Sequence, residues 1–231
     1  MPTSFGEPMI RLRAVPIEDN GEPLVDPRTL SQRVFLSDHP KFDELPHLPL
    51  VRQRVAEMLA EAADALPAGI AFAIIEGVRP INQQRSMYET VKAEFAAKHP
   101  EWNRATLHRV TNRLCAPPDD KCPPPHTTGA AVDLILVNSD SGDWLDMVSP
   151  FEMGESSATT KMPGLSKIAQ ANRELLVKSL SATGLTNYVG EWWHWSYGDS
   201  GWALRTGAPK AIYGRLPDFN LEVNLRTYYL R

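Results

Sequence analysis

Two segments of the sequence carry side chains that commonly bind metal ions. The first holds His126 and Asp133, seven positions apart, which a straight strand would point to opposite faces. Gly129 lies between them and accepts a positive φ at little cost, so we expect a turn that leaves His126 in a loop and Asp133 on the strand that follows. A carboxylate in the apolar run at 130–137 would be costly to bury without a partner, and a metal ion is one such partner.

The second segment holds Glu191 and His194, three positions apart among tryptophans. On one straight strand their side chains would diverge, so we expect Glu191 at a bend just before the strand that carries His194. His126, Asp133 and His194 form a set that suits catalytic zinc, which keeps a fourth position for water, whereas structural zinc usually has four ligands rich in cysteine. Zinc lowers the pKa of bound water to about 7, and we expect Glu191 to accept the proton as the water attacks a carbonyl group.

A third group could stabilise the negative charge that such an attack creates. Residues 70–75 form a short apolar run typical of a buried strand, and Arg79 follows it directly before Pro80. A fixed cation aimed at developing charge is often a large catalytic contribution. We therefore expect Arg79 to stabilise the transition state.

Each of these residues also has an ordinary structural interpretation. A single histidine is more often a hydrogen-bonded structural residue than a ligand, Glu191 could be a surface charge, and Arg79 could be half of a salt bridge. Their joint occurrence favours the metal site, because His126 and Asp133 flank a glycine before a strand and Glu191 lies three residues before His194.

The cysteines and the remaining histidines give no second site. Cys115 and Cys122 lie seven positions apart in a proline-rich stretch, where they could form a disulfide or stay as thiols, and a cytosolic protein would favour thiols. A zinc site built on them would need more ligands at short spacing, and only His126 is near. The four other histidines, expected at the surface, are His39, His47, His99 and His108.

The composition limits the class of protein. A chain of 231 residues with 42% hydrophobic residues is long enough for a sizeable core, and we expect one domain over residues 1–231. The formal charge of −4 provides no broad positive field for nucleic acid or anionic lipid. The first residues lack the apolar run of a secretory signal and no stretch approaches membrane-spanning length, so we expect a cytoplasmic protein, or a periplasmic one if a signal was removed.

The spacing of apolar residues predicts helices and strands spread along the chain. The expected helices cover residues 50–66, 82–98, 102–114 and 167–183. The expected strands cover residues 9–15, 32–36, 70–75, 130–137 and 192–197. This order has no regular alternation of strand and helix and no internal repeat, so we expect an α+β fold with helices packed on a small, mainly antiparallel sheet.

Three motifs follow one another along the chain: Gly-x-Arg-Pro at 77–80, His-x-x-Gly-x-Ala-x-Asp at 126–133 and Glu-Trp-Trp-His at 191–194. In these motifs and their order, the chain resembles the zinc D-alanyl-D-alanine dipeptidases of the VanX type, within the D,D-peptidases related to the hedgehog fold. The resemblance covers roughly residues 50–199, including Asn-Arg-Glu-Leu-Leu at 172–176. The two ends remain as extensions, which we expect to pack on the domain.

The resemblance implies a role for each candidate residue. It implies one zinc ion per chain, held by His126, Asp133 and His194. It also implies that Glu191 is the general base and acid and that Arg79 stabilises the transition state. The types and spacing of these residues indicate the same assignment by themselves.

Members of this family also bind the free amino group of the dipeptide through an acidic residue downstream of the ligand aspartate. Glu152 occupies the matching place here, where the family usually has aspartate. The chain further departs from the family at Val78, where tyrosine is common, and at Pro124, where many members have serine. These departures bear on substrate preference more than on catalysis.

We expect hydrolysis of D-alanyl-D-alanine or a closely related small dipeptide, in cell-wall turnover or in resistance to glycopeptide antibiotics. One alternative is a D,D- or L,D-carboxypeptidase or endopeptidase that cuts peptidoglycan stem peptides, which would need an export route and an open cleft. Another, from a different class, is a non-catalytic zinc- or peptide-binding protein, which would have little need of both Glu191 and Arg79.

Overall fold

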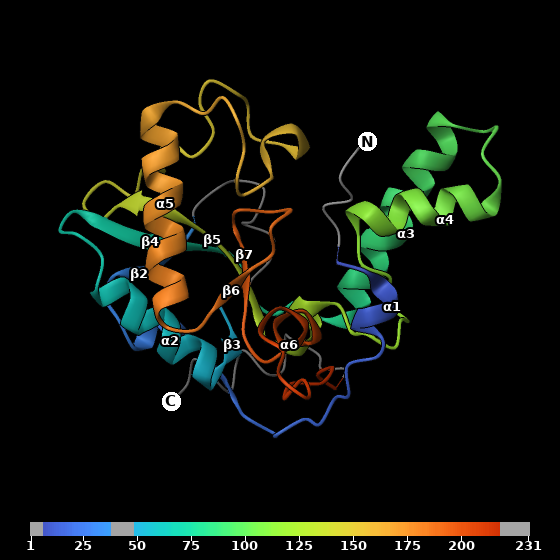
Figure 1. Cartoon of the computed structure of the whole chain (residues 1–231), viewed down its shortest axis with the longest axis horizontal. Coiled ribbons are helices and arrows are strands. Elements are labelled where there is room, and N and C mark those ends of the chain that lie inside the picture. The colour runs from blue at the N-terminus through green and yellow to red at the C-terminus, as the bar shows by residue number, and fades with distance from the viewer. Residues whose placement is uncertain (1–6, 38–48, 218–231) are drawn as a thin grey trace.

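The computed structural model describes residues 7–37 and 49–217 (Figure 1). Within these ranges the α-helices are α1 (Met9–Leu12), α2 (Gln53–Asp64), α3 (Ile81–Lys98), α4 (Arg104–Leu114), α5 (Lys167–Ala182) and α6 (Ser200–Thr206). The strands are β1 (Leu24–Val25), β2 (Val34–Leu36), β3 (Val51–Arg52), β4 (Ile70–Glu76), β5 (Ala131–Asn138), β6 (Thr186–Asn187) and β7 (His194–Ser196). Short 3₁₀ helices are η1 (Pro27–Thr29), η2 (Pro125–Thr128) and η3 (Glu155–Ser157).

A five-stranded sheet forms the centre of the described structure, in the order β2-β4-β5-β7-β6. In this sheet β2 and β4 run parallel, and the other neighbouring pairs are antiparallel. The two longest strands, β4 and β5, are almost completely buried, as apolar runs bounded by turns predict. The expected α+β class with a mainly antiparallel sheet is confirmed.

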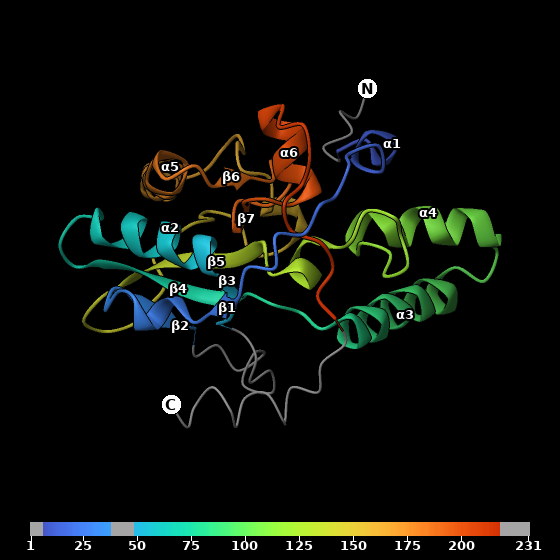
Figure 2. The ribbon, with the colours of Figure 1, turned by 90° about the horizontal axis from the view of Figure 1, so that it is seen from below.

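Helices α2 and α5 pack against each other on one face of the sheet (Figure 2). Apolar residues of α2 recur at three- and four-residue spacing, and Val55 and Leu59 are buried in the core. Helix α5 begins where the Ser166 side chain caps its first turn, and it buries Leu176 and Leu180. These helices and the sheet enclose the main hydrophobic core.

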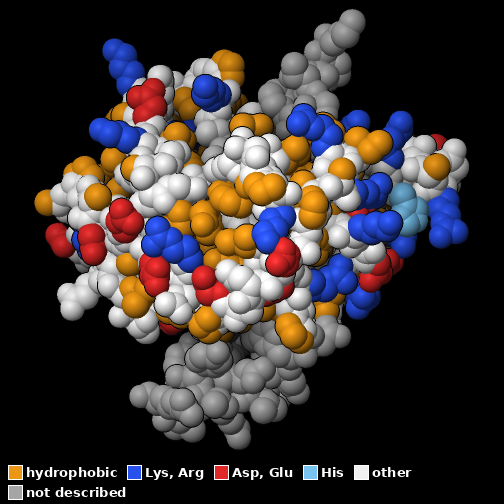
Figure 3. Space-filling model, turned by 60° about the horizontal axis from the view of Figure 1, so that its bottom comes forward, with side chains coloured by type: hydrophobic (Ala, Val, Ile, Leu, Met, Phe, Trp, Pro, Cys, Tyr) orange, Lys and Arg blue, Asp and Glu red, His pale blue; other side chains and the backbone are white. Residues whose placement is uncertain are grey.

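Helices α3 and α4 form a hairpin that stands to one side of the sheet (Figures 1 and 2). Helix α3 begins directly after Pro80, and the Asn103 side chain caps the first turn of α4. Helix α4 carries Arg104, Arg109 and Arg113 and no acidic residue, and basic side chains gather on this side of the surface (Figure 3). No helix in the described ranges is both long and apolar enough to cross a lipid bilayer.

Most of the expected elements are present. The helices expected at 50–66, 82–98, 102–114 and 167–183 are confirmed as α2, α3, α4 and α5. The strands expected at 32–36, 70–75, 130–137 and 192–197 are confirmed as β2, β4, β5 and β7, the last reduced to three residues.

The strand expected at residues 9–15 is wrong, because residues 9–12 form the single-turn helix α1. The amides of Arg11 and Leu12 donate to the Pro8 carbonyl, so this segment satisfies its polar groups locally. Helix α6 was not expected, although its signals are present in the sequence. Asp199 caps its start, and Gly207 ends it with a φ of 74°.

The described part of the N-terminal extension contacts the rest of the chain. The Glu18 amide donates to the Ala211 carbonyl at 3.0 Å, and Asp19 forms a salt bridge with the buried Arg52 at 2.7 Å. The C-terminal extension beyond residue 217 lies outside the described residues.

Of the histidines expected at the surface, His99 and His108 are partly exposed on the α3–α4 hairpin. The other two, His39 and His47, lie outside the described residues.

Candidate metal centre

The register of the central sheet brings two of the expected ligands together. Asp133 on β5 lies directly opposite His194 on β7, and Glu76 at the end of β4 pairs with Asp133 from the other side. Directly opposite residues on antiparallel strands have Cβ atoms about 4.5–5.5 Å apart. Strand pairing therefore aligns two carboxylates and an imidazole in one row across three strands.

His126 reaches this row from η2, the turn that precedes β5. Gly129 ends η2 with a φ of 72°, a left-handed conformation that residues with side chains rarely adopt. A Cβ atom at this position would also lie 2.8 Å from the Leu24 side chain. Both the backbone conformation and the close contact therefore favour glycine. The expected turn between His126 and the strand of Asp133 is present. The Arg79 amide donates to the His126 carbonyl at 3.1 Å and ties this turn to the segment after β4.

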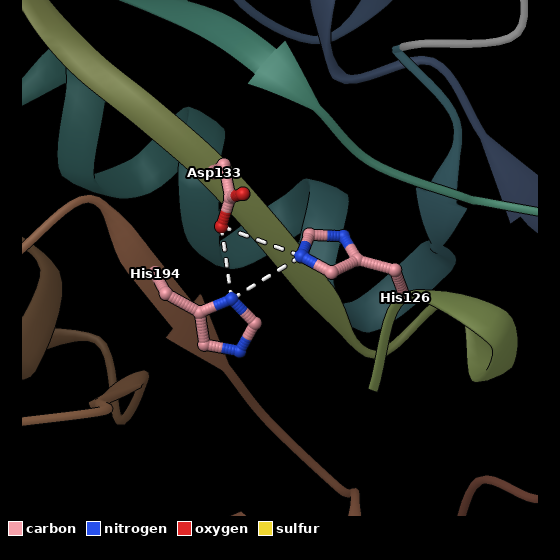
Figure 4. Close-up of side chains that lie close together, drawn as sticks. All are labelled: His126, Asp133 and His194. Atoms are coloured by element: carbon pink, nitrogen blue, oxygen red, sulfur yellow. Dashed lines mark hydrogen bonds and ion pairs between the residues drawn. The ribbon is translucent and has the colours of Figure 1, made fainter. Parts of the chain in front are cut away.

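The three expected ligands form one compact cluster (Figure 4). Asp133 Oδ1 lies 2.9 Å from His194 Nδ1 and 3.3 Å from His126 Nε2, and the two nitrogens are 3.2 Å apart. His126 and His194 are 4% and 8% exposed, so water replaces few of these contacts. Among the described residues, this is the one group of His, Cys, Asp and Glu side chains that could hold a metal ion.

The protonation of His126 follows from its second contact. Its Nδ1 lies 2.7 Å from the Gly77 carbonyl oxygen, which can only accept, so Nδ1 carries the proton. A neutral imidazole then has a lone pair on Nε2, the atom that faces Asp133 and His194. Nε2 of His126, Nδ1 of His194 and Oδ1 of Asp133 therefore face one another. A cation placed between them would satisfy all three.

The charges of the cluster reinforce this conclusion. Burial raises the pKa of Asp133, but the charge of His126 and the hydrogen bonds of both histidines outweigh burial and hold that pKa well below its usual value. Burial lowers the pKa of His194, but the hydrogen bond and charge of Asp133 outweigh it and raise that pKa. Asp133 therefore stays ionised, as a metal ligand must be.

Glu191 lies in the turn that precedes β7, as expected. Its amide donates to the Tyr188 carbonyl at 2.9 Å, and its carbonyl accepts from the His194 amide at 3.2 Å. The carboxylate does not belong to the ligand cluster. Burial raises the pKa of Glu191, and the charges of the three cluster residues and of Arg79 also act on it. A non-ligand carboxylate with a raised pKa beside the cluster is suited to accept and return a proton.

Arg79 is fixed just beyond β4 by two side chains. Its Nε donates to one oxygen of Glu76 at 2.7 Å and its Nη2 to the other, while Nη1 donates to Gln84 at 2.7 Å. Gln84 is buried and donates in turn to the Ala116 carbonyl at 2.8 Å. Burial lowers the pKa of Arg79, but Glu76 outweighs burial and raises it, so the guanidinium stays charged. Asp133 also raises this pKa, so the charges of Arg79 and the cluster interact.

Three partners of the site were missed from the sequence. These are the Gly77 carbonyl, which sets the tautomer of His126, and the side chains of Glu76 and Gln84, which hold Arg79. An acidic residue that ends an apolar strand three positions before an arginine is a usable signal for Glu76. Gln84 follows Arg79 by only five positions, but its residue type gives no comparable signal.

The structure does not bring Glu152 into the cluster. Its side chain is exposed in the loop between β5 and α5. That loop is nevertheless joined to the Glu191 turn, since the Trp192 amide donates to the Ala158 carbonyl at 2.9 Å. The role of Glu152 stays a prediction.

The tryptophans and cysteines have structural surroundings. Trp192 and Trp195 are 1% and 0% exposed and belong to the core. Cys115 and Cys122 are free thiols, and Cys115 is buried. The Gln84 side-chain amide, whose oxygen accepts from Arg79, donates to the Cys115 thiol at 3.3 Å.

Known proteins are similar to this chain over most of its length. A model of the D-ala-D-ala dipeptidase family of peptidases matches residues 44–212, which include every candidate residue of the site. The chain belongs to this family. A D-alanyl-D-alanine dipeptidase from Synechocystis sp. is 32% identical over 232 residues, which cover 87% of this chain and 92% of the relative. Another dipeptidase of this name, from Enterococcus faecalis, is 30% identical over 70 residues, or 30% of this chain and 35% of the relative.

Solved structures show more distant similarity. The LD-carboxypeptidase LdcB is 19% identical with a TM-score of 0.48, covering 83% of this chain and 77% of that chain. A mutant of the vancomycin resistance D,D-pentapeptidase VanY, in complex with Zn(II), is 17% identical with a TM-score of 0.42, covering 68% of this chain and 77% of that chain. Membership of the dipeptidase family, established by sequence, makes the chain a hydrolase that acts on peptide bonds.

Proposed function

We propose that this chain is a zinc-dependent dipeptidase that hydrolyses D-alanyl-D-alanine or a closely related small dipeptide. The observation that carries the proposal is the convergence of three ligand atoms at 2.9–3.3 Å from one another. Zinc binds nitrogen and oxygen ligands at roughly 2.0–2.2 Å, and a tetrahedral arrangement then separates them by about 3.3 Å. The cluster fits one such ion per chain, held by His126, Asp133 and His194. The name of the Synechocystis relative supports the choice of substrate.

When bound, zinc supplies a Lewis acid that polarises a carbonyl group and makes water nucleophilic near neutral pH. The proton that the attacking water loses needs an acceptor, and we assign this role to Glu191. The same group then delivers the proton to the leaving amine. Burial raises the pKa of Glu191 above its usual value, which suits a carboxylate that accepts a proton and then returns it.

Arg79 supplies a fixed positive charge for the oxyanion that forms when the carbonyl is attacked. Glu76 and Gln84 hold its guanidinium on three nitrogens, so little reorganisation is needed during the reaction. The contact of Arg79 with Glu76 also fulfils the salt-bridge interpretation of this residue. Both roles are compatible, because the pair orients the arginine while leaving it charged.

Glu152 would provide the preference for a dipeptide by pairing with the free ammonium group of the substrate. A blocked amine would leave this carboxylate without its partner, and a longer peptide would need the same space. What supports this role is the resemblance to the family and the attachment of its loop to the Glu191 turn. The exposed position of the side chain leaves it free to meet a ligand.

The proposal is tested with zinc-loaded protein and a panel of D,D-, L,D- and L,L-dipeptides, each with free and with N-acetylated amine. We expect free D-alanyl-D-alanine to be cleaved far better than its N-acetyl form, and Glu152→Ala to erase much of that difference. The matched control is Glu174→Ala, which removes an exposed carboxylate that lies on α5 and not in the Glu152 loop. It should leave the preference for the free over the N-acetylated dipeptide unchanged. Equal cleavage of both forms by the wild type would instead indicate a carboxypeptidase. Cytoplasmic location remains a prediction, which fractionation of cells expressing the full chain would test.

A further inference from the structure

Arg173 on α5 is a buried cation with an unusual set of partners. It is 3% exposed, and its guanidinium donates to the main-chain carbonyls of Met147 and Ser157, both at 2.7 Å, and of Thr159. Burial lowers its pKa to about 10, and no carboxylate among the described residues accepts a hydrogen bond from it. The Arg173 side chain therefore forms hydrogen bonds with both ends of the loop at residues 147–160.

The loop held in this way touches the turn that carries Glu191. The Trp192 amide donates to the Ala158 carbonyl at 2.9 Å, and the Thr160 amide donates to the Val189 carbonyl at 3.1 Å. The Arg173 guanidinium also lies over the Trp192 ring, 5.3 Å from its centre. Arg173 thus contacts both the loop and the Glu-Trp-Trp-His segment.

Ser157 extends this connection to Glu152. Its side chain is buried, and its hydroxyl donates to the Glu152 carbonyl at 2.7 Å while accepting from the Gly154 amide at 3.1 Å. The carbonyl of Ser157 is one of the acceptors of Arg173. A continuous set of hydrogen bonds therefore runs from α5 through Ser157 to the backbone of Glu152.

We propose that Arg173 and Ser157 are positioning residues that hold the loop of Glu152 against the Glu191 turn and thereby set the preference for a substrate with a free amine. The inference rests on the proposed function, and it gives a role to the Asn-Arg-Glu-Leu-Leu motif at 172–176, which lies outside the ligand cluster. Neither residue needs to touch the substrate. Both residues act by fixing the position of the Glu152 carboxylate.

Two variants test this role, Arg173→Lys and Ser157→Ala. A lysine keeps the charge but cannot donate to carbonyls in several directions as the planar guanidinium does. We expect both variants to keep bound zinc and to lose about ten-fold or more of the preference for free over N-acetylated D-alanyl-D-alanine, since small displacements of a substrate-positioning group have effects of that size. The loss should appear as a higher KM for the free dipeptide, with kcat changed little. In Arg173→Lys, the amides of Thr160 and Trp192 should also exchange hydrogen faster than in the wild type.

Arg33→Lys is the matched control, because Arg33 also donates to several main-chain carbonyls, those of residues 64, 66, 67 and 70. It should leave the preference unchanged. If Arg173→Lys fails to fold, the milder Ser157→Ala decides the question alone. A wild-type preference that survives in every folded variant overturns this inference and leaves the proposed function intact. Equal cleavage of both substrates by the wild type contradicts the proposed function and removes this inference with it.

Discussion

Strand β4 has an arginine near each of its ends, and the two ends differ in how their polar groups are partnered. Near its start, Arg33 donates to carbonyls that include those of Leu66 and Ile70. The guanidinium thus links the segment that follows α2 to the first residue of β4. Beyond its other end, Arg79 pairs with Glu76, and the neighbouring carboxylate of Asp133 faces two imidazoles.

The difference lies in the balance of donors and acceptors. At the Arg33 end, one cation donates to several main-chain oxygens. At the Arg79 end, the arginine is already occupied by Glu76 and Gln84, while the ligand atoms of the cluster converge within 3.3 Å. Such a buried group of converging ligand atoms could hold a further cation. The first end should therefore matter for stability and the second for chemistry.

The largest effect should come from the cluster itself. We expect His126→Ala or His194→Ala to strip zinc and to reduce turnover by more than about 10⁴-fold, because the loss includes all of the Lewis-acid contribution and not general-base catalysis alone. Elemental analysis and dipeptide hydrolysis measure the two changes. A chelator should have the same effect on the wild type, reversed by added zinc. Wild-type zinc content in both variants would show that these histidines are not ligands.

Glu191→Gln should come next. The amide keeps the shape of the side chain but cannot accept a proton, so we expect zinc to remain bound and kcat to fall by about 10²- to 10⁴-fold. Steady-state kinetics with metal analysis of the same sample separates this result from the loss of metal in the histidine variants. Full turnover in Glu191→Gln would exclude it as the base.

Arg79→Lys should have a smaller effect, of about 10²-fold, because lysine retains a positive charge but not the planar fork that Glu76 and Gln84 hold in place. The loss should appear mainly in kcat. A change confined to KM would mean that Arg79 binds the ground state of the substrate instead.

Arg33→Lys should have the smallest effect on activity. It tests whether the two ends of β4 differ in function. We expect kcat and KM to change less than about two-fold, while the melting temperature falls by about 2–4 °C, because carbonyls lose donors in a domain of this size. Calorimetry and dipeptide hydrolysis on the zinc-loaded protein measure both. A loss of activity as large as that of Arg79→Lys would show that the Arg33 end of β4 is not purely structural.

Local patterns in the sequence determined much of the fold and the candidate residues. The spacing of apolar residues predicted α2 and α5, and short apolar runs predicted β4 and β5, because helices and buried strands depend on which side chains face the core. The turn at Gly129 was also readable, since its need for positive φ depends on the backbone at that residue. The candidate metal ligands were predicted from residue type and from their position relative to these elements.

Only the tertiary structure decided how distant residues meet. Asp133 and His194 are 61 positions apart, and the register of β5 against β7 places them opposite each other. No pattern in the sequence indicated that Gln84 would accept a hydrogen bond from Arg79. Nor did any pattern indicate that Arg173 would donate to carbonyls at both ends of the Glu152 loop. Strand register and buried hydrogen bonds between separate elements depend on how all the elements pack at once, whereas periodicity reports only the neighbourhood of each residue.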